Sequence, residues 1–176
     1  MKRILSLLAF FLLASCLNVD DFGATWAKTN IDTRLAGIWK QVEVDTPLSK
    51  DAALSFSMKY GSYEVLLYEN GKVAEKPYYP VRSLEIGPYL FAAVGPKEGS
   101  MVRYTIEGDT LRFYQSDNNK VEAFLEKKFP AAAYPDLTFH GGTKVEVLND
   151  TTYKAISEIP DTPEYWKETS RYKRQP

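Results

Sequence analysis

The chain has 176 residues, of which 44% are hydrophobic and 14% aromatic, with 22 basic and 23 acidic side chains and a single cysteine. This composition excludes a disordered or collagen-like chain, and the near-neutral charge argues against a nucleic-acid-binding protein. One cysteine excludes an internal disulfide and a cysteine-built metal site. The length fits one domain with its own hydrophobic core.

The N-terminus has the pattern of an export signal. Lys2 and Arg3 precede an apolar run from Ile4 to Ala14. A helix that spans a bilayer needs about 20 apolar residues, so this run is too short to cross, but it matches the apolar region of a secretory signal.

The end of this signal, Leu13-Ala14-Ser15-Cys16, resembles the lipobox of bacterial lipoproteins. The resemblance implies that residues 1–15 are a signal peptide, that cleavage occurs between Ser15 and Cys16, and that Cys16 carries acyl chains that anchor the protein in a membrane. Leu17 differs from the Asp that favours retention in the inner membrane, so the periplasmic face of the outer membrane is expected. The alternatives are an ordinary signal with an incidental cysteine, or an uncleaved anchor.

Residues 16–34 are expected to form the lipidated cysteine and a short polar tether that ends in a helical turn. Its large side chains, Phe22, Trp26 and Ile31, are expected either to cap one end of the domain or to lie near the lipid surface. Residues 35–176 are expected to form a single β-rich domain.

That domain opens with an alternating strand that contains Gly37-Ile38-Trp39. This triplet resembles the Gly-x-Trp motif of lipocalins and related calycin barrels, which implies a barrel whose closed end is plugged by Trp39. In that family a basic side chain from the last strand lies across the Trp ring. Alternation along 167–174 puts Arg174 on the face of Tyr172, which makes Arg174 the expected partner and Arg171 the second choice.

The middle of the chain predicts a meander of short antiparallel strands. Strands are expected at 62–68, 81–86, 89–94, 101–106 and 110–114, with hairpins at Asn70-Gly71 and at Glu107-Gly108-Asp109. Pro77 and Pro80 limit the run after Val73 to an edge or a bulge.

After Tyr114 the pattern changes. A helix is expected from Asp117 to Pro130, strands at 137–139 and 144–148, and a second helix from Asp150 to Pro160. The fold class is therefore mostly β (α+β): an antiparallel meander of roughly seven to nine strands that closes into a lipocalin-like barrel, with two short late helices.

Catalytic and metal chemistry find little support. His140 is the only histidine and lies in a turn-like sequence, and the carboxylate pairs Glu43/Asp45 and Asp20/Asp21 are expected to be solvated. We therefore expect that the protein is not an enzyme and that it has no catalytic residue, metal or cofactor.

Tyrosine-rich strands favour binding of a small hydrophobic or amphipathic ligand inside the barrel of a lipid-anchored periplasmic protein. The alternative is an envelope accessory lipoprotein that docks on a protein partner and has no ligand cavity. For that alternative, Tyr78-Tyr79-Pro80 is the candidate contact surface.

Overall fold

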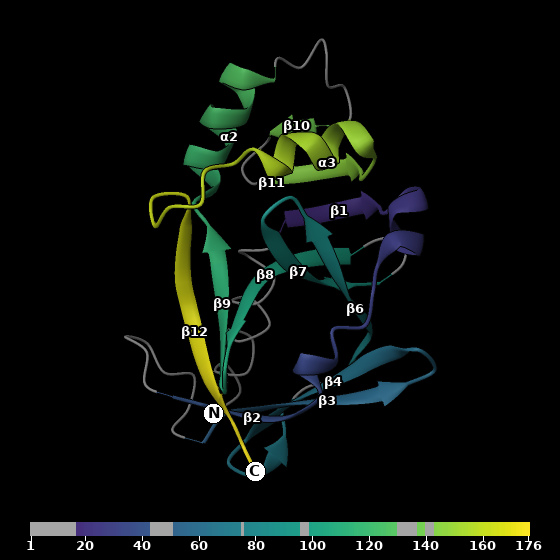
Figure 1. Cartoon of the computed structure of the whole chain (residues 1–176), viewed down its shortest axis with the longest axis vertical. Coiled ribbons are helices and arrows are strands. Elements are labelled where there is room, and N and C mark those ends of the chain that lie inside the picture. The colour runs from purple at the N-terminus through teal and green to yellow at the C-terminus, as the bar shows by residue number, and fades with distance from the viewer. Residues whose placement is uncertain (1–16, 43–50, 75, 96–98, 130–136, 140–142) are drawn as a thin grey trace, which may run out of the picture.

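The computed structural model describes residues 17–42, 51–74, 76–95, 99–129, 137–139 and 143–176. Its main feature is a closed barrel of eight antiparallel strands (Figure 1). In spatial order the ring is β8, β7, β6, β4, β3, β2, β12 and β9, and pairing of β9 with β8 closes it. The barrel confirms the predicted fold class.

The barrel strands are β2 (Gly37–Gln41), β3 (Ala53–Lys59), β4 (Ser62–Glu69), β6 (Tyr78–Ile86), β7 (Tyr89–Val94), β8 (Gly99–Glu107), β9 (Thr110–Ser116) and β12 (Trp166–Arg174). The two-residue β5 (Lys72–Val73) pairs antiparallel with the end of β4 across the predicted Asn70-Gly71 turn, where both residues have positive φ. The second predicted hairpin joins β8 to β9.

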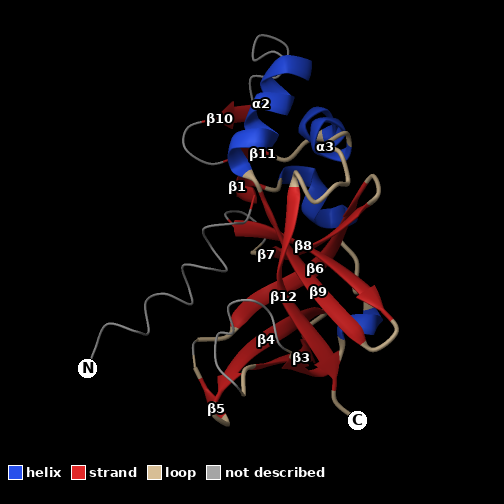
Figure 2. Ribbon diagram, turned by 90° about the vertical axis from the view of Figure 1, so that its left-hand side faces the viewer, coloured by secondary structure: helices blue, strands red, loops and turns tan. Residues whose placement is uncertain are grey.

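A second layer covers one side of the barrel. It contains β1 (Leu17–Asp21), which pairs with β8 and, in parallel, with β11 (Thr143–Val147), and β10 (Leu137–Phe139) beside β11. The helices α2 (Asn118–Lys128) and α3 (Asp150–Ser157) belong to this layer and lie together in both views (Figure 2). Both predicted helices are thus confirmed, with Asp117 and Asn149 as their N-caps.

The tether prediction is wrong for residues 17–34. Leu17, Val19 and Phe22 are fully buried, and the 3₁₀ helices η1 (Gly23–Lys28) and η2 (Thr33–Leu35) follow β1 without a polar linker. Trp26 packs against Phe22 with 5.5 Å between ring centroids, and Ile31 packs against the barrel interior, so these side chains belong to the domain. The folded part therefore includes Leu17.

The alternation of each strand produces two separate cores. Inward-facing residues of the barrel, with Leu35, form the first: Trp39, Leu54, Phe56, Tyr63, Val65, Leu67, Val81, Ala92, Tyr104, Leu111, Phe113 and Tyr172. Outward-facing residues of β6, β7 and β8 form the second with β1, α2 and α3. Side chains two positions apart share a face, so one strand serves both cores.

The structure has twelve strands among its described residues, more than the seven to nine expected. The sequence interpretation missed β1 and β3, and these elements have weak signals. β1 has only two apolar side chains, and β3 alternates with serines. Among the described residues, no helix combines the length and apolarity needed to cross a bilayer.

Candidate functional site

Residues 30–36 cover one end of the barrel, which we call the closed end. Asn30 bridges to Ser83 of β6 through two backbone hydrogen bonds, each of 2.8 Å. Further along, η2 brings Leu35 beneath Trp39, whose side chain is fully buried and whose Nε1 donates to the Leu35 carbonyl oxygen at 2.8 Å. The indole therefore has its polar atom satisfied and its ring in the core.

Arg174 lies over the Trp39 ring, with 4.3 Å between the guanidinium carbon and the ring centroid. The two residues are opposite each other in the β2–β12 ladder. The guanidinium also donates to the carbonyl oxygens of Ala36, at 2.8 Å, and of Arg34. One side chain from the end of the chain thus holds both the ring and the covering segment, whereas Arg171 pairs with Glu168 instead.

Gly37 permits this arrangement. Its φ of +114° lies in a region that side-chain-bearing residues rarely adopt, and a Cβ at this position would lie 3.8 Å from Arg174 Nη1. Gly37, Trp39 and Arg174 are therefore brought together at the closed end.

Asp32 is the polar centre of the closed end. Its carboxylate accepts hydrogen bonds from Arg34 and, at 2.9 Å, from the Tyr104 hydroxyl, and its carbonyl oxygen accepts from Tyr63 at 3.2 Å. Burial raises the pKa of Asp32, but the hydrogen bonds from Arg34 and Tyr104 outweigh it, and the net pKa is lowered. The carboxylate therefore stays ionised and joins residues 30–36 to β8, while the Asp32 carbonyl oxygen joins them to β4.

Aromatic rings pack against one another inside the barrel. Phe56 meets Tyr63 edge-on at 5.9 Å between centroids, and Phe113 contacts both Tyr104, at 6.5 Å, and Tyr172, at 6.0 Å. Burial raises the pKa of Tyr172 to about 12. These side chains give the interior an apolar lining with phenolic hydroxyls.

Further from the closed end, polar groups face inward without partners. Gln41, two residues after Trp39 on the same face of β2, is 8% exposed. Its Oε1 and Nε2, and Oε1 of Glu69 at the end of β4, are buried and have no hydrogen-bond partner within the part of the chain that the structure describes. Such groups are rare in folded proteins.

A buried arginine lies outside the barrel, beneath the segment that leads into β12. Arg103 is 6% exposed, and its guanidinium carbon lies 4.6–5.0 Å from the ring centroids of Tyr89, Tyr114 and Trp166. Its Nη2 donates to Asp161 at 2.6 Å. The three rings and one carboxylate stabilise this cation, which joins β8 to the chain just before β12.

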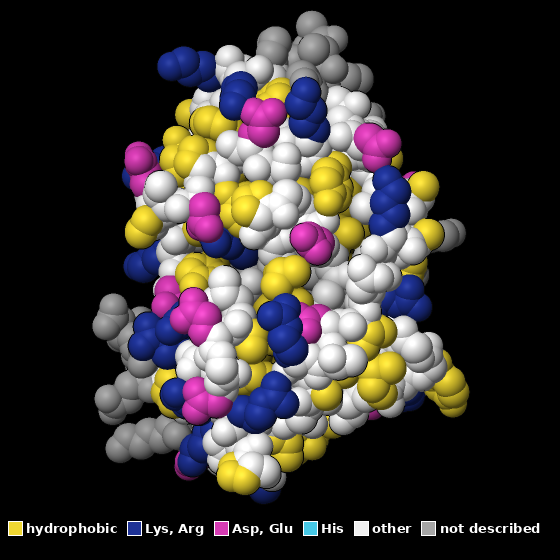
Figure 3. Space-filling model, in the orientation of Figure 1, with side chains coloured by type: hydrophobic (Ala, Val, Ile, Leu, Met, Phe, Trp, Pro, Cys, Tyr) yellow, Lys and Arg dark blue, Asp and Glu magenta, His cyan; other side chains and the backbone are white. Residues whose placement is uncertain are grey.

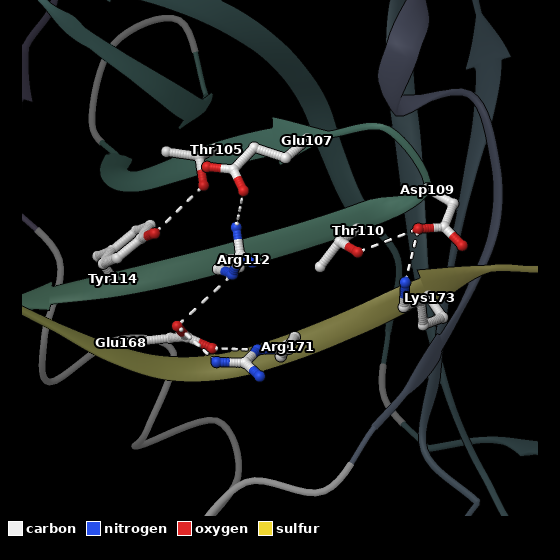
Figure 4. A network of polar contacts seen from close by, with 9 residues as sticks. All are labelled: Thr105, Glu107, Asp109, Thr110, Arg112, Tyr114, Glu168, Arg171 and Lys173. Atoms are coloured by element: carbon white, nitrogen blue, oxygen red, sulfur yellow. Dashed lines mark hydrogen bonds and ion pairs between the residues drawn. The ribbon is translucent and has the colours of Figure 1, made fainter.

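The basic end of the chain is largely compensated by nearby acids (Figure 4). Arg171 makes two hydrogen bonds to Glu168, Arg112 contacts Glu107 at 2.6 Å, and Lys173 contacts Asp109 at 2.6 Å. Figure 3 likewise shows basic and acidic side chains interspersed over the visible face. Acidic neighbours therefore pair with Arg112, Arg171 and Lys173.

Most of the remaining sequence-predicted positions cannot be placed in the fold. Ser15, Cys16, His140 and the Glu43/Asp45 pair lie outside the described residues. Asp21 accepts a hydrogen bond from the Gly23 backbone at 2.7 Å, so it serves as a local cap after β1. In the described ranges, no three His, Cys, Asp or Glu side chains form a group that fits a metal ion.

Sequence reasoning missed Gln41, Glu69, Asp32 and Arg103. A signal existed for Gln41, because a polar residue at the inward parity set by Trp39 departs from the apolar pattern. No family model, no curated protein and no solved structure matches this chain.

Proposed function

We propose that this chain is a lipid-anchored lipoprotein of the bacterial envelope, at the periplasmic face of the outer membrane, whose barrel binds a small amphipathic ligand. The anchor rests on the lipobox-like Leu13-Ala14-Ser15-Cys16. One observation carries the ligand hypothesis: inside an apolar barrel covered at one end, Gln41 presents a buried amide without a partner. Ligand sites in proteins combine an apolar lining with a few placed polar groups.

The anchor is tested by Cys16→Ser in a host that processes lipoproteins. The expected result is loss of the mature, membrane-bound form, because serine cannot form the thioether. Ser6→Ala, in the middle of the apolar run, is the matched control and retains lipidation. A Cys16→Ser chain that keeps both the mature mass and its membrane partition contradicts the anchor.

The ligand is tested by native mass spectrometry of the protein from its own host, after removal of the acyl chains. A retained small molecule, or saturable fluorescence enhancement of the neutral probe N-phenyl-1-naphthylamine, supports the proposal. The proposal is contradicted if no small molecule is retained and the probe shows no saturable binding.

A second candidate is docking on a protein partner. It is favoured by the aromatic packing that fills part of the barrel and by exposed apolar side chains, among them Met58 (55% exposed), Tyr60 (88%) and Tyr79 (41%). Lys59 lies over the Tyr79 ring at 5.6 Å, which joins the β3–β4 hairpin to the predicted Tyr78-Tyr79-Pro80 surface. A photo-crosslinker at Tyr60 that yields one discrete protein adduct in cells, absent with Tyr79→Ser, favours docking.

A further inference from the structure

Gln41 and Glu69, the two described residues with unpartnered groups inside the barrel, belong to one row of neighbouring inward positions. Gln41 is opposite Tyr172 in the β2–β12 ladder, and its backbone N–H donates to the Ala52 carbonyl oxygen at 2.8 Å. Ala53 is opposite Tyr68 in the β3–β4 ladder, so Ala52 faces Glu69 at the next position. The inward row therefore reads Tyr172, Gln41, Ala52 and Glu69.

The two polar members of the row are separated by a small residue. Side chains opposite each other on neighbouring strands have Cβ atoms about 5 Å apart, so the Cβ atoms of Gln41 and Glu69 are roughly 10 Å apart across Ala52. Ala52 is fully buried but contributes only a methyl group. Leu54 and Leu67, the next inward residues on β3 and β4, add an apolar surface beside the row.

The row also offers more acceptors than donors. Gln41 Oε1 and Glu69 Oε1 are buried acceptors without partners, and Gln41 Nε2 is the one unpartnered donor that the described chain places beside them. Lys72 is opposite Glu69 in the short β4–β5 ladder, but it is exposed and makes no ion pair with Glu69 in the described structure. A buried carboxylate oxygen without a donor favours a ligand that brings its own N–H groups.

We propose that this row recognises the polar end of the barrel's ligand and that this end is a primary ammonium group. The inference rests on the proposed function and names the ligand class: an amphipathic amine with an apolar body. The ammonium donates to Glu69 Oε1 and Gln41 Oε1, while the apolar body lies against the leucines and aromatic rings of the interior. Gln41 Nε2 remains available to a hydroxyl or carbonyl oxygen next to the amine.

The test compares three ligands of one chain length: decylammonium, decanol and decanoate. Each displaces N-phenyl-1-naphthylamine from the full chain carrying Cys16→Ser, with fluorescence as the readout. Decylammonium is expected to bind at least about tenfold more tightly than decanoate, because only the amine meets a carboxylate of opposite charge.

Glu69→Gln removes the charge and keeps the shape, so the preference is expected to fall to within about threefold. Glu64→Gln is the matched control, because it makes the same change on the outward face of β4, where Glu64 pairs with Lys59. Gln41→Met is expected to weaken decylammonium more than decanol, since decanol needs fewer acceptors. All variants share the same N-terminal run, so differences between them report on the barrel.

The outcomes separate the inference from the proposed function. Equal displacement by all three ligands, or tighter binding of decanoate, overturns the ammonium site while ligand binding by the barrel stands. An undiminished preference in Glu69→Gln, or an equal loss in Glu64→Gln, also overturns it. No saturable probe binding overturns both.

Discussion

The closed end of the barrel depends on Arg174, and Arg174→Met tests this directly. Methionine keeps the unbranched stem but removes the contact with the Trp39 ring and the hydrogen bonds to the carbonyl oxygens of Arg34 and Ala36. A cation–π contact at a partly exposed site contributes about 0.5–1 kcal/mol, and each hydrogen bond from a charged donor contributes about 1.5–3 kcal/mol when buried. Because Arg174 is exposed, we take only about 0.5–1 kcal/mol for each of the two hydrogen bonds, which together with the ring contact gives an expected loss of about 1.5–3 kcal/mol.

The assay is urea unfolding followed by circular dichroism, with free energies from linear extrapolation. Lys173→Met is the matched control, because it removes a neighbouring cation whose only described contact is an exposed pair with Asp109. Exposed pairs contribute about 0.2–1 kcal/mol, so the control is expected to lose much less. Arg174→Lys keeps the charge but not the fork geometry and is expected to fall between the two.

A double-mutant cycle with Trp39→Ala separates the ring contact from the hydrogen bonds. Trp39→Ala alone is expected to cost about 3–5 kcal/mol, since the ring is fully buried. The coupling between the two changes is expected to be about 0.5–1 kcal/mol. An Arg174→Met loss no larger than that of Lys173→Met, with no coupling to Trp39, would refute this account of the closed end.

Two further predictions concern the fold. Asp32 has a lowered pKa in the folded state, so its stabilisation is present above its ordinary value of 3.8 and is lost as the pH falls through the folded pKa. The difference in unfolding free energy between the wild type and Asp32→Asn should therefore shrink from pH 7 to pH 3 in urea titrations; a constant difference contradicts this. Gly87 and Gly108 both have φ near +60°, but a Cβ at Gly87 would lie 2.7 Å from the Ser157 Cβ and one at Gly108 meets nothing within 4 Å. Gly87→Ala should thus lower the melting temperature clearly more than Gly108→Ala. Equal shifts would show that α3 can move away from the added methyl group without a loss of stability.

Local signals in the sequence predicted local structure well. The Asn70-Gly71 and Glu107-Gly108-Asp109 hairpins and both helices follow from turn residues, caps and periodicity within short stretches. The contact of Arg174 with Trp39 was also expected, because the Gly-x-Trp resemblance implies a basic partner from the last strand and alternation puts Arg174 on the face of Tyr172.

Features that depend on distant neighbours could not be predicted in this way. Leu17–Asp21 resembles a polar tether when considered alone, and it becomes a strand only because β8 and β11 offer it hydrogen-bonding edges. The lack of hydrogen-bond partners for Gln41 and Glu69 depends on all the residues around them. The pattern of a single strand does not show which donors and acceptors its neighbours provide. Arg103 likewise reads as one more basic residue until β12 brings Trp166 against it.

The position of β1 affects how the protein would stand on a membrane. Leu17 and Asn18 are already paired with β8, so an acyl group on the preceding Cys16 would be attached directly to a rigid sheet. Such an anchor would have no flexible linker. The barrel would then lie close to the bilayer in a restricted orientation, unlike a lipoprotein with a long linker after its lipidated cysteine. Anything exchanged with the barrel would then have to arrive from a restricted range of directions.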